Sequence, residues 1–221
     1  MQPLTIFDDD FESISELSWL PWVGSGYGSK PKLLLIGESH YYRENQKELY
    51  EVDKNSTREA ISESAIHEYW KVNTYKNLNK LLSGNDDGNN KQVWSKVAYH
   101  NICQRILAIG ERPNYLDYVE GWKILFRVMK IIKPDVCISI GVEAYNHLEY
   151  STKLTSNNLK YMRKDEKISG TYAREALIIN GKEIKMIGIK HTSKYFSWHL
   201  WYEYLNRKLD NILVKLLEDD K

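Results

Sequence analysis

Four short segments of this chain are almost entirely apolar, without the regular alternation that marks a strand with one solvent-exposed face. Such runs are typical of strands buried on both faces of a parallel sheet. They are Lys32–Gly37, Val97–Ile102, Asp135–Ile140 and Ile184–Ile189. A fifth segment, Ala176–Ile179, is followed by an Asn-Gly turn signal and is predicted to form a hairpin with the last strand.

Segments with the 3.6-residue period of helices lie between and after these predicted strands. They are Arg58–Leu82, Tyr118–Ile132, a short stretch after Gly141, and Trp198–Leu217. Strands that alternate with helices predict an α/β fold of three layers, with a central, mostly parallel sheet flanked by helices. The polar segment Ser83–Lys91, rich in Gly and Asn, is predicted to be a surface loop.

A chain of 221 residues favours a single domain, which we place at residues 30–221. Residues 1–29 are expected to be an N-terminal extension that packs on the domain through Trp19, Leu20 and Trp22. The segment Tyr42–Asn73 is longer than a plain connection between a strand and a helix. Such length beside a site often builds a lid or a pocket wall.

Composition narrows the class of protein. The sequence has no run of about 20 apolar residues and no basic start followed by an apolar run, so a soluble, cytoplasmic protein is expected. The two cysteines, Cys103 and Cys137, suit buried thiols in a reducing compartment and are too few for an iron-sulfur cluster. We expect no metal and no nucleotide cofactor, because metal-ligand spacings and phosphate-binding glycine motifs are missing.

The formal net charge of +1 conceals opposite charges at the two ends of the chain. Residues 1–70 carry six Lys and Arg against thirteen Asp and Glu, a balance of −7, whereas residues 151–215 carry thirteen against six, a balance of +7. Local basic density attracts phosphates, because each phosphate that is neutralised releases counterions. Charge alone fits a nucleic-acid interface and an ordinary solvated surface equally well.

Polar residues directly after the predicted strands are the first candidates for a site, because ligands bind beyond the carboxyl ends of strands in such sheets. Glu38 follows a strand and a Gly turn, where a carboxylate can stabilise a cationic sugar or serve merely as a turn acid. The imidazole of His191 can hydrogen-bond a leaving group that gathers negative charge. The amide of Asn101 can bind the edge of a pyrimidine, although an Asn near a strand end is more often a turn residue.

The order of four motifs resembles that of the uracil-DNA glycosylase superfamily. An apolar strand leads into Gly37–Tyr41, a second strand delivers Asn101, Gly-x-x-Ala follows a third strand at Gly141–Ala144, and Lys190–Lys194 follows the last. The resemblance covers about residues 30–210. It implies a monofunctional DNA glycosylase that flips a base out of DNA and hydrolyses its N-glycosidic bond.

Residue by residue, the resemblance implies a complete site in which Glu38 and His191 are catalytic. The base would be bound by Gly37, Ser39, His40, Tyr41, Tyr42 and Asn101. DNA would be bound by Lys190, Thr192, Ser193, Lys194 and Tyr195, and the candidates for a wedge into the duplex are Tyr195, Phe196 and Trp198. The resemblance also implies a monomer without a cofactor that acts on double-stranded or single-stranded DNA.

The chain departs from the family pattern at three positions. Ser39 stands where uracil-specific members carry a water-activating Asp, and His40 and Thr192 stand where the family has prolines. These departures favour a modified pyrimidine over uracil, for example the glucosylated hydroxymethylcytosine of phage DNA removed by bacterial defence enzymes. The alternatives are a repair glycosylase for uracil or deaminated bases, a non-catalytic DNA-binding module, and an unrelated α/β hydrolase, for which the G-x-S-x-G elbow is missing.

Overall fold

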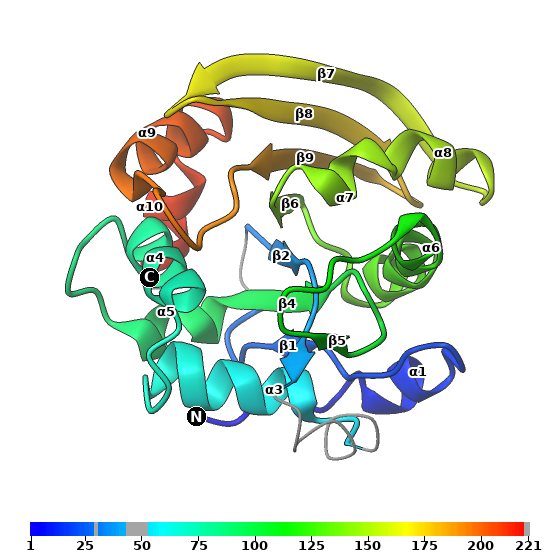
Figure 1. Ribbon diagram of the computed structural model, residues 1–221, viewed down its shortest axis with the longest axis horizontal. Coiled ribbons are helices and arrows are strands. Elements are labelled where there is room, and N and C mark those ends of the chain that lie inside the picture. Colours follow the sequence, from blue (N-terminus) through cyan, green and yellow to red (C-terminus); the bar gives the residue numbers. More distant parts are fainter. Residues whose placement is uncertain (29–30, 43–52, 219–221) are drawn as a thin grey trace.

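The computed structural model describes residues 1–28, 31–42 and 53–218. Its centre is a seven-stranded sheet of order β1-β4-β2-β6-β9-β8-β7 (Figure 1). The strands are β1 Trp22–Val23, β2 Leu33–Gly37, β4 Val97–Asn101, β6 Val136–Ile140, β7 Asn158–Ile168, β8 Thr171–Ile179 and β9 Glu183–Ile189. A separate small sheet pairs β3 (Tyr41–Tyr42) with β5 (Leu107–Ala108) in parallel.

The four predicted apolar segments form the parallel centre of the sheet, in the order β4-β2-β6-β9. Every residue of β2, β4 and β6 is buried, which explains why their sequences lack an alternating pattern. The predicted α/β class with helices around a mostly parallel sheet is confirmed. The predicted hairpin is present as well, because Ile179 of β8 pairs with Glu183 of β9 across the Asn180-Gly181 turn.

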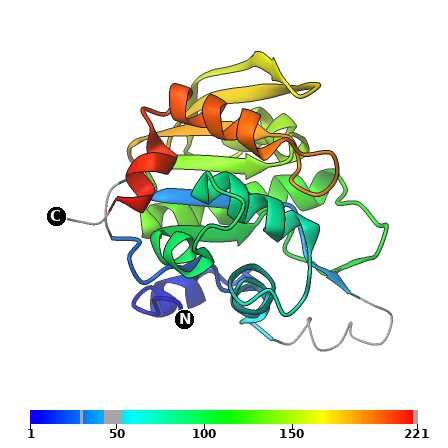
Figure 2. The same ribbon diagram turned by 90° about the vertical axis from the view of Figure 1, so that its left-hand side faces the viewer.

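Helices cover both faces of the sheet (Figure 2). Leu33 and Leu35 point into one apolar cluster, and Leu34 and Ile36 point into the other. The first cluster is covered by the π-helix Ile61–Ile66, which continues from α3 Ser56–Ala60, and by α4 Asn73–Ser83, α5 Asn90–Lys96, α9 Trp198–Lys208 and α10 Ile212–Leu217. The second is covered by α1 Asp8–Glu12, α6 Tyr115–Ile132, α7 Glu143–Asn146 and α8 Leu148–Lys153.

Two segments predicted as single helices are interrupted. Between residues 66 and 73 the chain leaves the π-helix before α4 begins, and Glu68 has a φ of 54°. Between α9 and α10, Asp210 and Asn211 have φ values of 52° and 59°. A left-handed backbone ends a right-handed helix, and the apolar period continues across the break because both pieces pack on the same core.

Several elements were not predicted, among them one helix and one long strand. The helix α5 begins at Asn90, inside the predicted loop Ser83–Lys91, and β7 has no fully buried residue from which a strand pattern could be recognised. Residues 1–28 also add the edge strand β1, in which Trp22 pairs with Tyr99 of β4. Among the described residues, no helix combines the length and apolarity needed to cross a membrane.

Gly121 lets α6 approach the end of β4. A Cβ at this position would overlap the carbonyl oxygen of Ile102. Alanine ordinarily stabilises a helix interior relative to glycine, but here we expect Gly121→Ala to lower the free energy of unfolding by roughly 1–3 kcal/mol, because backbone atoms must move. Urea unfolding measures the loss.

The matched control is Gly28→Ala, because a Cβ there would meet no atom within 4 Å. This control is expected to change the free energy of unfolding by less than about 0.5 kcal/mol. If both variants unfold at the same urea concentration as the wild type, the close approach of α6 to Ile102 is contradicted.

Candidate functional site

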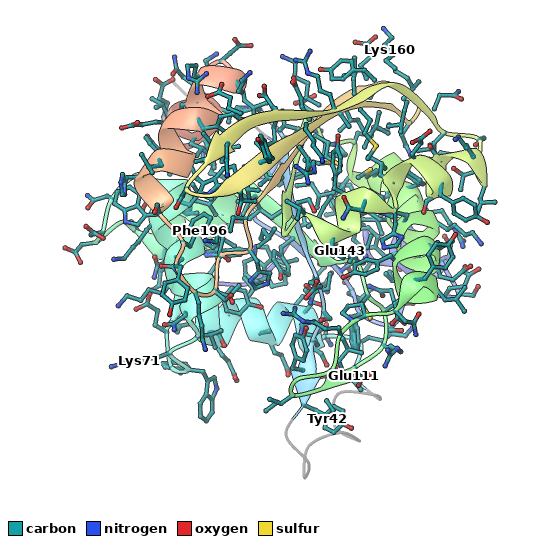
Figure 3. All side chains as sticks on the ribbon, turned by 45° about the horizontal axis from the view of Figure 1, so that its top comes forward. Tyr42, Lys71, Glu111, Glu143, Lys160 and Phe196 are labelled. Carbon is teal, nitrogen blue, oxygen red and sulfur yellow. The ribbon has the colours of Figure 1, made fainter. Side chains whose placement is uncertain are left out.

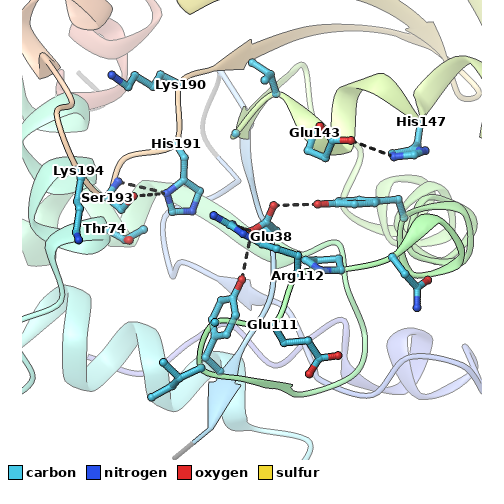
Figure 4. Close-up of a pocket in the computed structure, with 18 of the residues that line it drawn as sticks. Glu38, Thr74, Glu111, Arg112, Glu143, His147, Lys190, His191, Ser193 and Lys194 are labelled. Atoms are coloured by element: carbon cyan, nitrogen blue, oxygen red, sulfur yellow. Dashed lines mark hydrogen bonds and ion pairs between the residues drawn. The ribbon is translucent and has the colours of Figure 1, made fainter.

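A pocket of about 1220 Å³ lies at the carboxyl ends of β2, β6 and β9 (Figure 4). Because these strands are parallel neighbours, the segments that follow them meet at one edge of the sheet. The loop before α6 and the first turn of α6 close the opposite side. The polar, charged and aromatic side chains that line the pocket include Glu38, Tyr41, Arg112, Tyr115, Tyr118, Glu143, His147, Lys190, His191, Ser193 and Lys194.

Glu38 is a largely buried carboxylate of the pocket, with 14% of its side chain exposed. Its Oε1 accepts a hydrogen bond from Tyr118 Oη at 2.9 Å. Its Oε2 accepts from Arg112 Nη1 at 3.0 Å and from Tyr41 Oη at 3.3 Å. The negative charge of Glu38 raises the pKa of Arg112, and burial followed by the same charge raises the pKa of Tyr118. Three donors therefore fix the orientation of one carboxylate.

His191 follows β9 and presents a neutral ring to the pocket. The backbone N–H of Ser193 donates to its Nδ1 at 3.3 Å, and Ser193 Oγ lies 3.0 Å from the same nitrogen. Burial lowers the pKa of His191, partly opposed by the charge of Glu38. Because Nδ1 accepts a hydrogen bond, the proton of the neutral ring resides on Nε2. His191 is thus a hydrogen-bond donor at neutral pH.

Asn101 is buried behind Gly37 and does not line the pocket. Its Oδ1 accepts a hydrogen bond from Tyr99 Oη at 2.8 Å, and a Cβ on Gly37 would overlap both side chains. Its Nδ2 is buried without a hydrogen-bond partner. In this arrangement the side chain packs beneath the turn that leads to Glu38, and the predicted contact between Asn101 and a base stays a prediction.

His40 and Thr192 also lie inside the protein, outside the pocket lining. His40 Nε2 is 2.8 Å from Thr57 Oγ1, its ring packs edge-on against Trp19, and burial lowers its pKa to about 4. The side chain of Thr192 is fully buried, and its carbonyl accepts a hydrogen bond from Asn77. In this arrangement neither side chain lines the pocket, and the predicted base contact of His40 and DNA contact of Thr192 stay predictions.

Of the remaining predicted base-binding residues, Tyr41 is the one that lines the pocket. Tyr41 lines it through the ring that reaches Glu38. Gly37 is the last residue of β2, Ser39 is half-buried after Glu38, and Tyr42 ends β3. The turn therefore brings the ring of Tyr41 into the pocket.

The predicted DNA-binding residues are concentrated on one loop. Lys190, Ser193 and Lys194 line the pocket. Tyr195 is 90% exposed with a φ of 53°, so a left-handed turn holds its ring in solvent. Phe196 is buried and stacks parallel to the ring of the core residue Trp201, and the partly buried Trp198 packs against the same core. Tyr195 is consequently the one predicted wedge residue that is free to reach a ligand.

Sequence reasoning missed the wall opposite His191. The Tyr118 ring stacks on His147 at 4.7 Å, Tyr115 packs edge-on against His147 at 5.4 Å, and Glu143 lies 3.5 Å from His147 Nε2. A signal for this wall was available: Asn114 caps α6 by accepting from the N–H of Asp117, three residues later. Such a capping box places the next residues at the start of a helix, beside the loop.

No group of His, Cys, Asp or Glu side chains within the described ranges is arranged to hold a metal ion. Both cysteines are free, buried thiols, and burial raises the pKa of Cys103 to about 11. The pocket offers acid–base and hydrogen-bonding groups, with Glu38 and His191 among them.

The electrostatic link between Glu38, Arg112 and His191 can be measured. Burial lowers the pKa of His191 most, Glu38 raises it, and Arg112 lowers it. We expect Glu38→Gln to lower the His191 pKa further and Arg112→Met to raise it. A ¹H–¹³C NMR titration of the imidazole measures both shifts. The pocket variant Glu143→Gln is the control and should leave the pKa unchanged; shifts of the same sign in the first two variants would contradict the arrangement.

Comparison of the sequence with protein-family models finds no match, and comparison with curated proteins finds none either. A function must therefore be inferred from the chemistry of the pocket, in which a carboxylate and a neutral imidazole N–H occupy the carboxyl ends of two parallel strands.

Proposed function

We propose that this protein is a DNA glycosylase that hydrolyses the N-glycosidic bond of a flipped-out base. The observation that carries the proposal is that Glu38 and the neutral ring of His191 line the same pocket. Breaking the bond leaves a cationic sugar and an anionic base. A carboxylate and a hydrogen-bond donor are the groups that stabilise these two charges.

The chemistry of the pocket suggests how the bond is broken. As the C1′–N bond breaks, its electron pair moves onto the base, and His191 Nε2–H donates a hydrogen bond to the base. Glu38 stabilises the sugar cation and orients a water molecule that adds to C1′. The water loses a proton as it adds, and overall that proton neutralises the departing base anion. Tyr118 and Arg112 are positioning residues, because their hydrogen bonds hold the carboxylate of Glu38 in place.

The loop after His191 supports DNA as the substrate. Lys190 and Lys194 bring positive charge to the pocket, where phosphates that flank a flipped nucleotide would pass. Tyr195 extends from the same loop into solvent. A ring held outside the protein suits a wedge that fills the gap left by the extruded base.

Pocket size is compatible with a bulky base. The volume of about 1220 Å³ has to admit the sugar and flanking phosphates as well as the base. We favour a modified pyrimidine such as glucosylated hydroxymethylcytosine of phage DNA, because Ser39 and His40 depart from the motif of uracil-specific members. On such a substrate the protein would act in defence against phage, as a monomer in the bacterial cytoplasm.

The test is an abasic-site assay on uracil-containing DNA, unmodified DNA and phage DNA with glucosylated hydroxymethylcytosine, followed by alkaline cleavage. We expect product from the phage DNA. Glu38→Gln and His191→Ala should each slow its formation by roughly 100- to 1,000-fold, because each removes a group that stabilises charge in the transition state.

The matched controls are Glu203→Gln and His199→Ala, which change the same residue types at exposed positions of α9 and should retain the wild-type rate. Product from uracil DNA alone would establish a repair glycosylase. DNA binding without product from any substrate would contradict the catalytic proposal and leave a binding module.

The wedge has a separate test. Tyr195→Ala should reduce excision from duplex DNA by about tenfold or more and leave excision from single-stranded DNA nearly unchanged, because only the duplex must be opened. The ratio of the two single-turnover rates is measured. Ile6→Ala removes a similarly exposed apolar side chain from the N-terminal segment and should preserve the ratio. A wild-type ratio in Tyr195→Ala would exclude the wedge.

A further inference from the structure

The β7–β8 hairpin ends beside the pocket. Thr171, the first residue of β8, lines the pocket. At the tip, Ser169 Oγ lies 3.1 Å from Ser197 Oγ, in the segment that continues from the His191 loop to α9. Figure 1 shows the same proximity of the hairpin end to α9. A surface on this hairpin therefore adjoins the site.

One face of the hairpin near its tip is basic. Lys164 pairs with Arg174, and Lys167 pairs with Tyr172. Paired residues on neighbouring strands share a face, and so do residues two positions apart on one strand. The Nζ of Lys167 lies 5.7 Å from the centre of the Tyr172 ring, which is 48% exposed. Three cations and an exposed aromatic ring thus lie together, and they are called the hairpin face below.

Acidic residues at the same level of β7 are neutralised by α9. Asp165 pairs with Lys208 at 2.7 Å and accepts a hydrogen bond from Tyr204, while Glu166 pairs with Arg207 at 2.6 Å. The adjacent carboxylates therefore already form ion pairs with α9. They do not neutralise the cations of the hairpin face.

Within the part of the chain that the structure describes, Lys164, Lys167 and Arg174 form no ion pair with a carboxylate. By contrast, Lys160, which lies at the opposite end of β7 (Figure 3), pairs with Glu183. The stem of the Arg174 side chain lies over Gly188 of β9, two residues before Lys190. Positive charge therefore continues from the hairpin face to the rim of the pocket.

We propose that the hairpin face binds the phosphate backbone of DNA on one side of the flipped nucleotide. This inference rests on the proposed function, which identifies the polyanion as DNA. It is argued from the match between the unpaired cations of the hairpin face and the negative phosphates. Lys and Arg bind phosphates without regard to sequence, and the Tyr172 ring between them can stack on a base or a sugar. Together with Lys190 and Lys194, the hairpin face extends the DNA contact well beyond the pocket.

The test is the salt dependence of DNA binding. A fluorescent 20-base-pair duplex is titrated at several salt concentrations with protein carrying Glu38→Gln, which slows cleavage enough for binding to be followed. The slope of log K against log salt reports the number of phosphates neutralised, at about 0.9 for each. Adding Lys164→Ala, Lys167→Ala and Arg174→Ala should reduce the magnitude of the slope by about 2–3 and weaken binding to every DNA sequence alike.

The matched control removes three cations that are already ion-paired, and therefore changes the net charge by the same amount. Its substitutions are Lys123→Ala, Lys153→Ala and Lys160→Ala. The control should keep the wild-type slope. A second variant, Lys164→Arg, Lys167→Arg and Arg174→Lys, retains the charge and should keep the slope as well, which separates charge from any effect on folding.

The outcomes distinguish this inference from the proposed function. If the wild type excises a base and both alanine triples have the same slope, the hairpin proposal is overturned and the glycosylase proposal stands. If the wild type neither binds nor cleaves any DNA, the glycosylase proposal fails first. If the hairpin triple loses binding to phosphatidylserine vesicles while its DNA slope is unchanged, the face binds a membrane instead of DNA, and the proposal is again overturned.

Discussion

The close contact between α6 and the end of the parallel sheet is the constraint on which the candidate site depends. Gly121 allows the helix backbone to meet the carbonyl of Ile102, and one turn earlier Tyr118 reaches the carboxylate of Glu38. The loop before the helix brings Arg112 to the other oxygen. If α6 lay farther from the sheet, Glu38 would lose the Tyr118 donor and the pocket would lose its aromatic wall.

Charge is divided between structural and uncompensated groups in the basic C-terminal part of the chain. Arg207 and Lys208 on α9 neutralise carboxylates of β7, so they contribute little to an external field. Among the described residues, the cations without a carboxylate partner include Lys190 and Lys194 at the pocket and the three cations of the hairpin face. The excess of Lys and Arg over Asp and Glu in the sequence does not separate paired from unpaired cations. That separation depends on which side chains the fold brings within ion-pair distance.

The parallel strands and the positions of Glu38 and His191 could be predicted because buried strands are continuous apolar runs and polar residues at their carboxyl ends share one edge. The burial of Asn101 and Thr192 could not, because it depends on which side of the chain faces the core just where regular structure ends. Likewise, the helix breaks at Asp210 because the backbone there is left-handed. The spacing of apolar residues does not reveal such a break. The role of Arg112 depends on a loop conformation.

The most direct test of the central claim is a crystal structure of the protein bound to DNA that carries the excised base on a 2′-fluorinated sugar, which resists cleavage because fluorine disfavours the sugar cation. We predict that C1′ lies beside the Glu38 carboxylate and that His191 Nε2 donates to an oxygen of the base. A base bound elsewhere, or a flipped nucleotide with His191 and Glu38 on the same side of its glycosidic bond, would contradict this account.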